Sequence, residues 1–244
     1  MSKDATVVVI KNYDLRRRIV ALTVIPALLL SSLIVAIPLV FTGIANVTIT
    51  VGLVITVVAE VLVVIWGLWF AGFIKDWPEK LHFKNFKWRY LLLGIVAGQL
   101  FYWGLQLLAV IASALGTPVG SSNTAMSLGS LKGPESIIVL LLVVPFIGPF
   151  VEEFLFRGVI VTSLKNSKWS STKLAIIVSA VSFGIMHIQG FASFTDLAIV
   201  LWITLMGGLF AYLYIKTQSF WTVFAAHAVY NLTSSVLLLT GLVH

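Results

Sequence analysis

The sequence predicts an all-α membrane protein, a polytopic bundle of about seven transmembrane helices. Hydrophobic residues make up 59% of the 244 residues and charged residues only 10%, which leaves too little polar surface for a soluble domain. The mean hydropathy is +1.06, and several apolar runs reach the roughly 20 residues that cross a bilayer. The net charge of +7 reflects membrane topology, and we expect no nucleic-acid partner. The absence of cysteine excludes disulfides and thiolate chemistry.

Seven apolar stretches are the predicted spans, and short polar turns or loops separate them. The fourth span contains Pro145 and Pro149, so it is either one bent helix or two pieces, which would raise the count to eight. We divide the chain into a cytoplasmic N-terminal segment (1–18), N-terminal transmembrane helices and loops (19–136) and a catalytic transmembrane core (137–244). The spans cover residues 19–41, 47–74, 90–115, 137–164, 174–189, 197–215 and 220–239.

Lysine and arginine predict the orientation, because they favour the cytoplasmic side. With a cytoplasmic N-terminus, all but two of the 16 lie in cytoplasmic segments; the exceptions are Lys132, in an external loop, and Arg157, inside a span. This bias favours seven spans over eight. One basic connection, residues 75–89, is expected to lie on anionic headgroups. The small size and short loops favour a multi-pass protein of a bacterial plasma membrane.

Ionisable residues inside the predicted spans indicate a functional site. Each costs about 2.5–3.5 kcal/mol at the centre of a membrane helix. Glu152, Glu153 and Arg157 lie in the fourth span, His187 in the fifth and His227 in the seventh. At a rise of about 1.5 Å per residue, Glu152 and His187 lie roughly 18–20 Å from the cytoplasmic end and His227 roughly 10 Å. Three helices therefore place polar groups near mid-membrane.

The sequence spacing of these residues predicts which of them share a helix face. Glu153 and Arg157 are four residues apart with the acid first, the favourable order for a helical ion pair. Glu152 is rotated by about 100° from Glu153, so it can point elsewhere. His227 and Asn231 are also four residues apart and can address one ligand.

This combination of residues suits the activation of water. A carboxylate in a low-dielectric pocket, Glu152, can act as general base, and His187, beside an aromatic wall formed by Phe183, could hold the water or share the proton. His227 and the Asn231 amide supply donors for a developing oxyanion. Alternatively, Glu152, His187 and His227 could form a two-histidine, one-carboxylate zinc site. The usual helical zinc signature is absent, so zinc is possible but not required.

Other interpretations stay open. Single histidines and Asn231 can hydrogen-bond a neighbouring helix, and the Glu153–Arg157 pair can be structural. A non-enzymatic immunity or scaffold protein would use the same groups to bind a peptide or a partner membrane protein. An ion-coupled transporter would use them, with Glu60, as a relay, but the chain lacks the matching halves typical of transporters.

Three motifs in series resemble the CPBP family (CAAX protease and bacteriocin-processing, also called Abi) of intramembrane proteases. The residues from Glu152 to Arg157 match the pattern EExxxR, Phe183 to His187 match FxxxH, and His227 to Asn231 match HxxxN. Each motif alone is weak, but the three occur in order with family-like separations. The likeness covers roughly residues 145–231.

The resemblance implies a helical membrane endopeptidase that acts on a peptide or a membrane-associated protein, in bacteriocin or pheromone processing or in self-immunity. Members of the family have been called metalloproteases, yet we favour a glutamate-activated mechanism without a catalytic metal. The implied roles are water activation by Glu152 and His187, oxyanion stabilisation by His227 and Asn231, and support of the site by Glu153, Arg157 and Phe183.

Overall fold

The computed structural model describes residues 15–17, 19–20, 23, 49–70, 72, 75–116, 137–165, 171–188 and 194–242. Within these ranges every regular element is a helix and no strand occurs, which confirms the all-α class. The predicted first span lies almost wholly outside the described residues. The helices are α2 (Ile49–Phe70), α3 (Trp77–Lys80), α4 (Trp88–Ala114), η1 (Val139–Ile147), α7 (Gly148–Glu153), η2 (Phe154–Val161), α8 (Thr162–Lys165), α9 (Thr172–Met186), α10 (Phe194–Thr217) and α11 (Phe220–Leu239).

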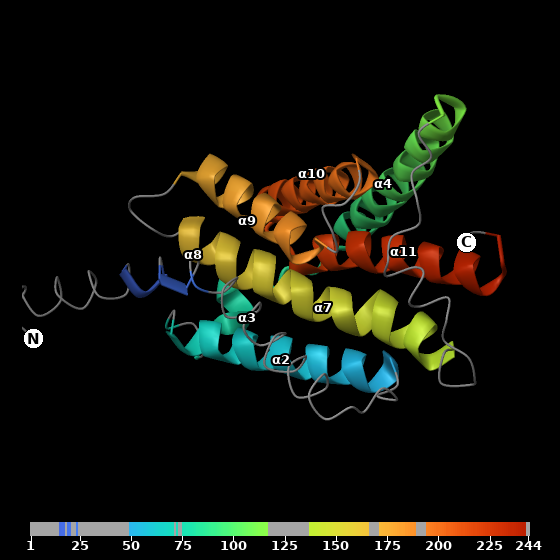
Figure 1. Ribbon diagram of the computed structural model, residues 1–244. Helices are drawn as coiled ribbons and strands as arrows, with labels where there is room; N and C mark the ends of the chain where they lie inside the picture. The colour runs from blue at the N-terminus through green and yellow to red at the C-terminus, as the bar shows by residue number, and fades with distance from the viewer. Residues whose placement is uncertain are drawn as a thin grey trace, which may run out of the picture.

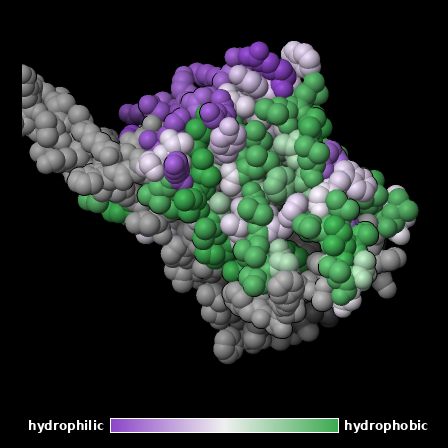
Figure 2. Space-filling model, turned by 90° about the horizontal axis from the view of Figure 1, so that it is seen from above, coloured by the Kyte–Doolittle hydropathy of each residue, from purple (hydrophilic) through white to green (hydrophobic). Residues whose placement is uncertain are grey.

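Helix length and composition identify a membrane protein. In the described part of the chain, two shorter apolar helices accompany the long ones, and hydrophobic side chains cover most of the described surface in Figure 2, with hydrophilic residues gathered along one edge. The total of seven spans stays a prediction, because part of the chain lies outside the described ranges. Helices that are long and apolar enough to cross a bilayer cover Trp88–Ala114, Val139–Lys165, Leu197–Thr217 and Phe220–Leu239.

The fourth predicted span is one helix rather than two. The backbone stays helical from residue 137 to residue 165, although Pro145 lies inside η1 and Pro149 lies in the first turn of α7. A proline removes one N–H donor and crowds the preceding turn, and the wider π turns of η1 accommodate this locally. The two-piece alternative, and with it an eighth span at this point, is therefore absent.

This long helix forms the centre of the bundle. In Figure 1 it runs from η1 to α8 with α2 along one side and α9 along the other, while α4 crosses obliquely beside α11. Gly94 and Gly98 of α4 allow its close approach to α11. A Cβ atom at Gly94 would overlap the carbonyl oxygen of Thr222, and one at Gly98 would overlap that of Ala226. Small residues at such crossings are typical of membrane bundles.

Replacing Gly98 by alanine should therefore destabilise the bundle. The new methyl group would meet backbone, which cannot move aside like a side chain, and overpacking of this kind costs about 1–3 kcal/mol or more. We expect a lower thermal unfolding midpoint for purified Gly98→Ala in detergent. Gly208→Ala is the matched control, because its nearest neighbour would be Ala180 Cβ at 3.5 Å. Equal midpoints for the two variants would contradict the α4–α11 packing.

Candidate active site

A buried ion pair lies inside the bundle, as the spacing predicts. Arg157 Nη1 donates a hydrogen bond to Glu153 Oε1 at 2.8 Å, and both side chains are fully buried. Arg157 Nη2 donates to the carbonyl oxygen of Gly207 at 3.1 Å. The guanidinium thus ties the central helix to α10, and a buried charge of this kind is tolerated only with such partners.

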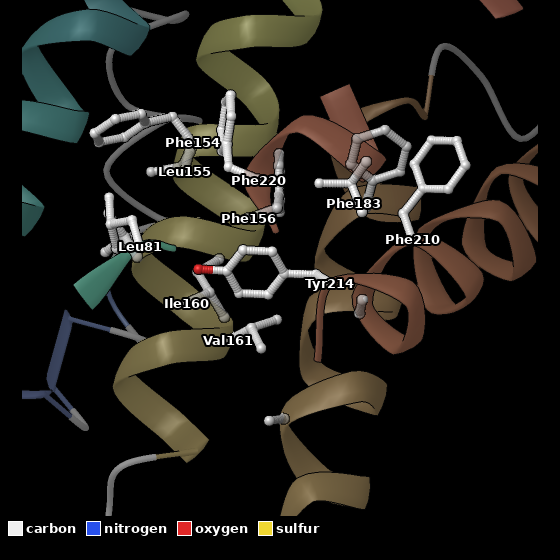
Figure 3. Packing of buried hydrophobic residues seen from close by; sticks show 14 of the residues in the cluster. Leu81, Phe154, Leu155, Phe156, Ile160, Val161, Phe183, Phe210, Tyr214 and Phe220 are labelled. Carbon is white, nitrogen blue, oxygen red and sulfur yellow. The ribbon is translucent and has the colours of Figure 1, made fainter. Parts of the chain in front are cut away.

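Three aromatic rings surround the same guanidinium. Its central carbon lies 4.6 Å from the ring centroid of Phe183, 5.4 Å from that of Phe210 and 5.8 Å from that of Phe156. Figure 3 shows Phe183 and Phe210 lying close to each other beside α9 and α10. Cation–π contacts of this kind offset part of the lost hydration of a cation. Phe210 is a site residue that was not predicted from the sequence. Its only signal there is its position three residues after Gly207, on the same helix face.

His227 is held by the same glutamate. Its Nδ1 lies 2.9 Å from Glu153 Oε1, and because a carboxylate oxygen accepts, Nδ1 donates. This contact fixes the tautomer and the ring orientation. The Nε2 atom is then directed to Glu152, at 3.9 Å from Oε2. Glu153 therefore connects Arg157 on one side to His227 on the other.

His187 approaches Glu152 from a different helix. Its Nδ1 lies 2.7 Å from the carbonyl oxygen of Phe183, so Nδ1 carries the hydrogen in this imidazole as well, and Nε2 lies 3.8 Å from Glu152 Oε2. The predicted fifth span was too long, because α9 ends at Met186 and His187 is its C-cap. The predicted aromatic wall is present, with the rings of Phe183 and His187 4.6 Å apart.

Glu152 lies where these groups converge. Its side chain is 22% exposed, and Oε2 is buried without a hydrogen-bond partner among the described residues. The 3.8 and 3.9 Å separations from the two Nε2 atoms are too long for direct hydrogen bonds, but they suit a small polar group held between them. The structure thus brings together Glu152, His187 and His227 from α7, the end of α9 and α11.

Asn231 makes an interhelical hydrogen bond, the alternative role that its place in an apolar helix left open. Its Nδ2 donates to the carbonyl oxygen of Val144 at 3.0 Å. Gly148 N–H donates to Val143 instead, and Pro149 has no N–H, so neither residue serves the Val144 carbonyl. The asparagine satisfies this carbonyl and joins α11 to η1. Its role at an oxyanion stays a prediction.

The side chains around Glu152 are of the types that bind a metal ion, but their ligand atoms lie farther apart in this structure than the ligands of one zinc ion. Both histidines keep Nε2 free while Nδ1–H is held by an oxygen, as is usual for zinc ligands. Ligand atoms on one tetrahedral zinc lie about 3.4 Å apart, a few tenths of an ångström less than the 3.8 and 3.9 Å found between each Nε2 and Oε2. Among the described residues, no group of three or more His, Asp or Glu is arranged to hold a metal ion.

Fold and site define a class of protein, a helical membrane protein with a carboxylate set between two imidazoles inside its bundle. Residues 134–233 match the family model described as "Type II CAAX prenyl endopeptidase Rce1-like", and this stretch contains every predicted site residue. A Bacillus subtilis (strain 168) protein named "Putative membrane peptidase YdiL" is 32% identical over 97 residues, which are 40% of this chain and 36% of that protein. No solved structure matches the chain significantly.

These matches confirm the resemblance drawn from the three motifs. Over residues 134–233 the chain is similar to this family of CAAX-protease-like membrane peptidases. The match spans little more than a third of the length of the curated relative.

Proposed function

We propose that this chain is an intramembrane peptidase of the CAAX-protease-like type. The observation that carries the proposal is the buried, unpartnered Oε2 of Glu152 between the Nε2 atoms of His187 and His227. A structural glutamate at this depth would hold direct partners through one of its oxygens, as Glu153 does through Oε1, although Glu153 Oε2 is also without a hydrogen-bond partner among the described residues. The descriptions of the matching family and of the relative as endopeptidase and peptidase support hydrolysis of a peptide bond.

In the proposed reaction Glu152 acts as general base. A water held between Glu152 and His187 gives a proton to Oε2 while its oxygen attacks the carbonyl carbon of the scissile peptide bond. The tetrahedral intermediate collapses with cleavage of the C–N bond, and the proton passes from Glu152 to the leaving nitrogen. The products are a new carboxyl terminus and a new amine, which together account for the atoms of one water.

His227 and Asn231 are proposed to stabilise the oxyanion of that intermediate. Since Nδ1 of His227 already carries a hydrogen, Nε2 can donate only when the ring is doubly protonated. The Glu153 carboxylate beside Nδ1 holds the ring so that Nε2 faces the reacting group. The Asn231 amide uses one hydrogen on Val144, which leaves its second hydrogen for the oxyanion. Glu153 and Arg157 act as positioning residues that hold His227.

The proposed mechanism needs no metal, and a chelator tests this. If zinc binds, Glu152, His187 and His227 would hold it, and the ion would acidify a bound water or polarise the substrate carbonyl. We expect the purified, active protein to keep its cleavage activity after treatment with EDTA and removal of the chelator. A complete loss of activity that zinc restores would overturn the metal-free mechanism.

We further propose that the substrate is a peptide or a membrane-associated protein of a bacterial plasma membrane, with the N-terminus of the peptidase in the cytoplasm. The cation bias among the predicted loops supports this orientation. Comparison of the membrane proteomes of cells carrying wild type or Glu152→Ala tests the function, because new C-termini should occur only with the wild type. Identical termini in both strains, with a phenotype that Glu152→Ala retains, would favour a non-enzymatic immunity or scaffold protein.

A further inference from the structure

A second polar site lies at one end of the bundle and shares no residue with the Glu152 site. It is a pocket of about 300 Å³ lined by residues of α3, the turn after α3, α8, α10 and the turn after α10. Lys165 is the last residue of one helix that can cross a bilayer, and Gln218 lies between the ends of two others. The pocket is therefore at the depth where membrane helices meet lipid headgroups.

The residues that line the pocket carry a net positive charge. Lys80 and Lys165 are lining residues, and Lys165 has no ion pair in the part of the chain that the structure describes. The one lining carboxylate, Glu79, is paired with Lys84, which holds the pKa of Glu79 below its usual value. Asp76 lies 3.9 Å from Lys80. At least one ammonium group is thus free to meet an anion.

Neutral donors complete the lining. Burial, and secondarily the nearby Lys165 charge, lower the pKa of His82, so its imidazole is neutral near pH 7 and has one N–H. The ring of His82 lies 5.5 Å from that of the buried Tyr214. The Tyr214 hydroxyl is 3.2 Å from Thr162 Oγ1, and Figure 3 shows the side chain reaching from α10 towards Leu81 with the hydroxyl at its tip. The N–H of His82 and the second amide hydrogen of Gln218, whose first is donated to Ile215, can donate hydrogen bonds to anionic oxygens. The Tyr214 hydroxyl instead donates to Thr162, whose own hydrogen goes to the carbonyl oxygen of Arg157.

The backbone around the pocket is held in an unusual conformation. Among the described residues, the non-glycine residues with positive φ are His82, at 56°, and Gln218, at 50°, and both line the pocket. Such conformations cost free energy and persist where neighbours enforce them, often at ligand sites. Here Asn85 Nδ2 bonds the carbonyl oxygens of Thr217 and Gln218 at 3.2 and 2.7 Å. The turn after α3 is thereby fixed against the turn after α10.

We propose that this pocket binds a phosphate ester, the headgroup phosphate of an anionic membrane phospholipid. Basic pockets between membrane helices bind such headgroups through their charge. The depth of the pocket favours lipid over free phosphate, because Lys165 and Gln218 lie where the apolar helices end. Phe86, in the connection between α3 and α4, and Trp88, the first residue of α4, are 56% and 69% exposed and offer apolar surface for the acyl chains.

Retention of lipid during purification tests this inference. The assay measures bound lipid and not peptide cleavage, so it can fail or succeed independently of the proposed function. The full-length protein, exchanged into neutral detergent with added phosphatidylglycerol or phosphatidylcholine, is washed, and the bound lipid is measured by mass spectrometry. We expect wild type to retain phosphatidylglycerol in at least fivefold excess over phosphatidylcholine. Lys165→Gln should lose most of that excess. The matched control Lys173→Gln, an exposed lysine of α9 outside the pocket, should keep it.

Competition separates the two sources of phosphate. If millimolar inorganic phosphate displaces phosphatidylglycerol completely, the pocket is a free-phosphate site and the headgroup assignment is overturned. Equal retention of phosphatidylglycerol by wild type and Lys165→Gln would refute the assignment of this pocket as the lipid-binding site. Should Lys165→Gln fail to fold, as judged by gel filtration, Lys80→Gln supplies the loss-of-charge variant and Lys165→Arg should retain the lipid.

Discussion

Glu152→Gln should abolish peptide cleavage while the variant accumulates in the membrane at the wild-type level. The amide has the size of the carboxylate but cannot take a proton from water, and loss of a general base typically costs 10²–10⁴-fold in rate. Folding should be little affected, because Glu152 Oε2 has no hydrogen-bond partner among the described residues. The measurements are the cleavage rate of the substrate found by proteomic comparison and the amount of protein in isolated membranes.

The matched control for this prediction is Asp76→Asn. Asp76 is a carboxylate whose side chain is 50% exposed, and it lines neither the Glu152 site nor the pocket at His82, so the substitution replaces a carboxylate by its amide away from both sites. It should leave the cleavage rate within about twofold of wild type, since surface substitutions rarely perturb a fold. Undiminished cleavage by Glu152→Gln would refute the assignment of Glu152 as base.

Arg157→Met should give the largest loss of stability of the substitutions considered. The variant leaves the fully buried Glu153 carboxylate without its guanidinium and removes the bond to Gly207. Breaking a buried ion pair by removing one partner costs about 3–5 kcal/mol. We expect reduced abundance in the membrane and a lower unfolding midpoint in detergent.

The double variant Glu153→Gln/Arg157→Met distinguishes a lost ion pair from lost packing. Removing both charges spares the cost of an unpaired carboxylate, so the double variant should be more stable than Arg157→Met alone. It should still cleave poorly, because an amide holds His227 less firmly than a carboxylate. If the double variant is less stable than Arg157→Met, the charge argument is wrong and packing dominates.

The polar residues of the site could be predicted from the sequence because charges are conspicuous in apolar helices. Glu153 and Arg157 pair as their spacing predicts, and Glu152 and the two histidines converge. The bounds predicted for the last span, 220–239, coincide with α11. Periodicity and hydropathy are strong signals for elements of this kind.

The features that escaped prediction depend on contacts between distant segments. The sequence does not show that Glu153 also holds His227, since this needs the relative position of two helices. The contact of Asn231 with Val144 arises from a carbonyl left without a backbone donor near Pro149. The pocket at His82 depends on left-handed backbone at non-glycine residues, which local sequence does not specify. The central helix continues past Pro145 because the backbone forms π turns there, and the sequence does not show such turns.

The most direct test of the central claim, that Glu152 activates water for peptide-bond hydrolysis, is cleavage in H₂¹⁸O. The substrate is incubated with the reconstituted protein in labelled water, and the new C-terminus is examined by mass spectrometry. The mechanism predicts one ¹⁸O atom in that carboxylate after a single cleavage by wild type, and no labelled product with Glu152→Gln. Labelled product formed by Glu152→Gln at the wild-type rate would contradict the account.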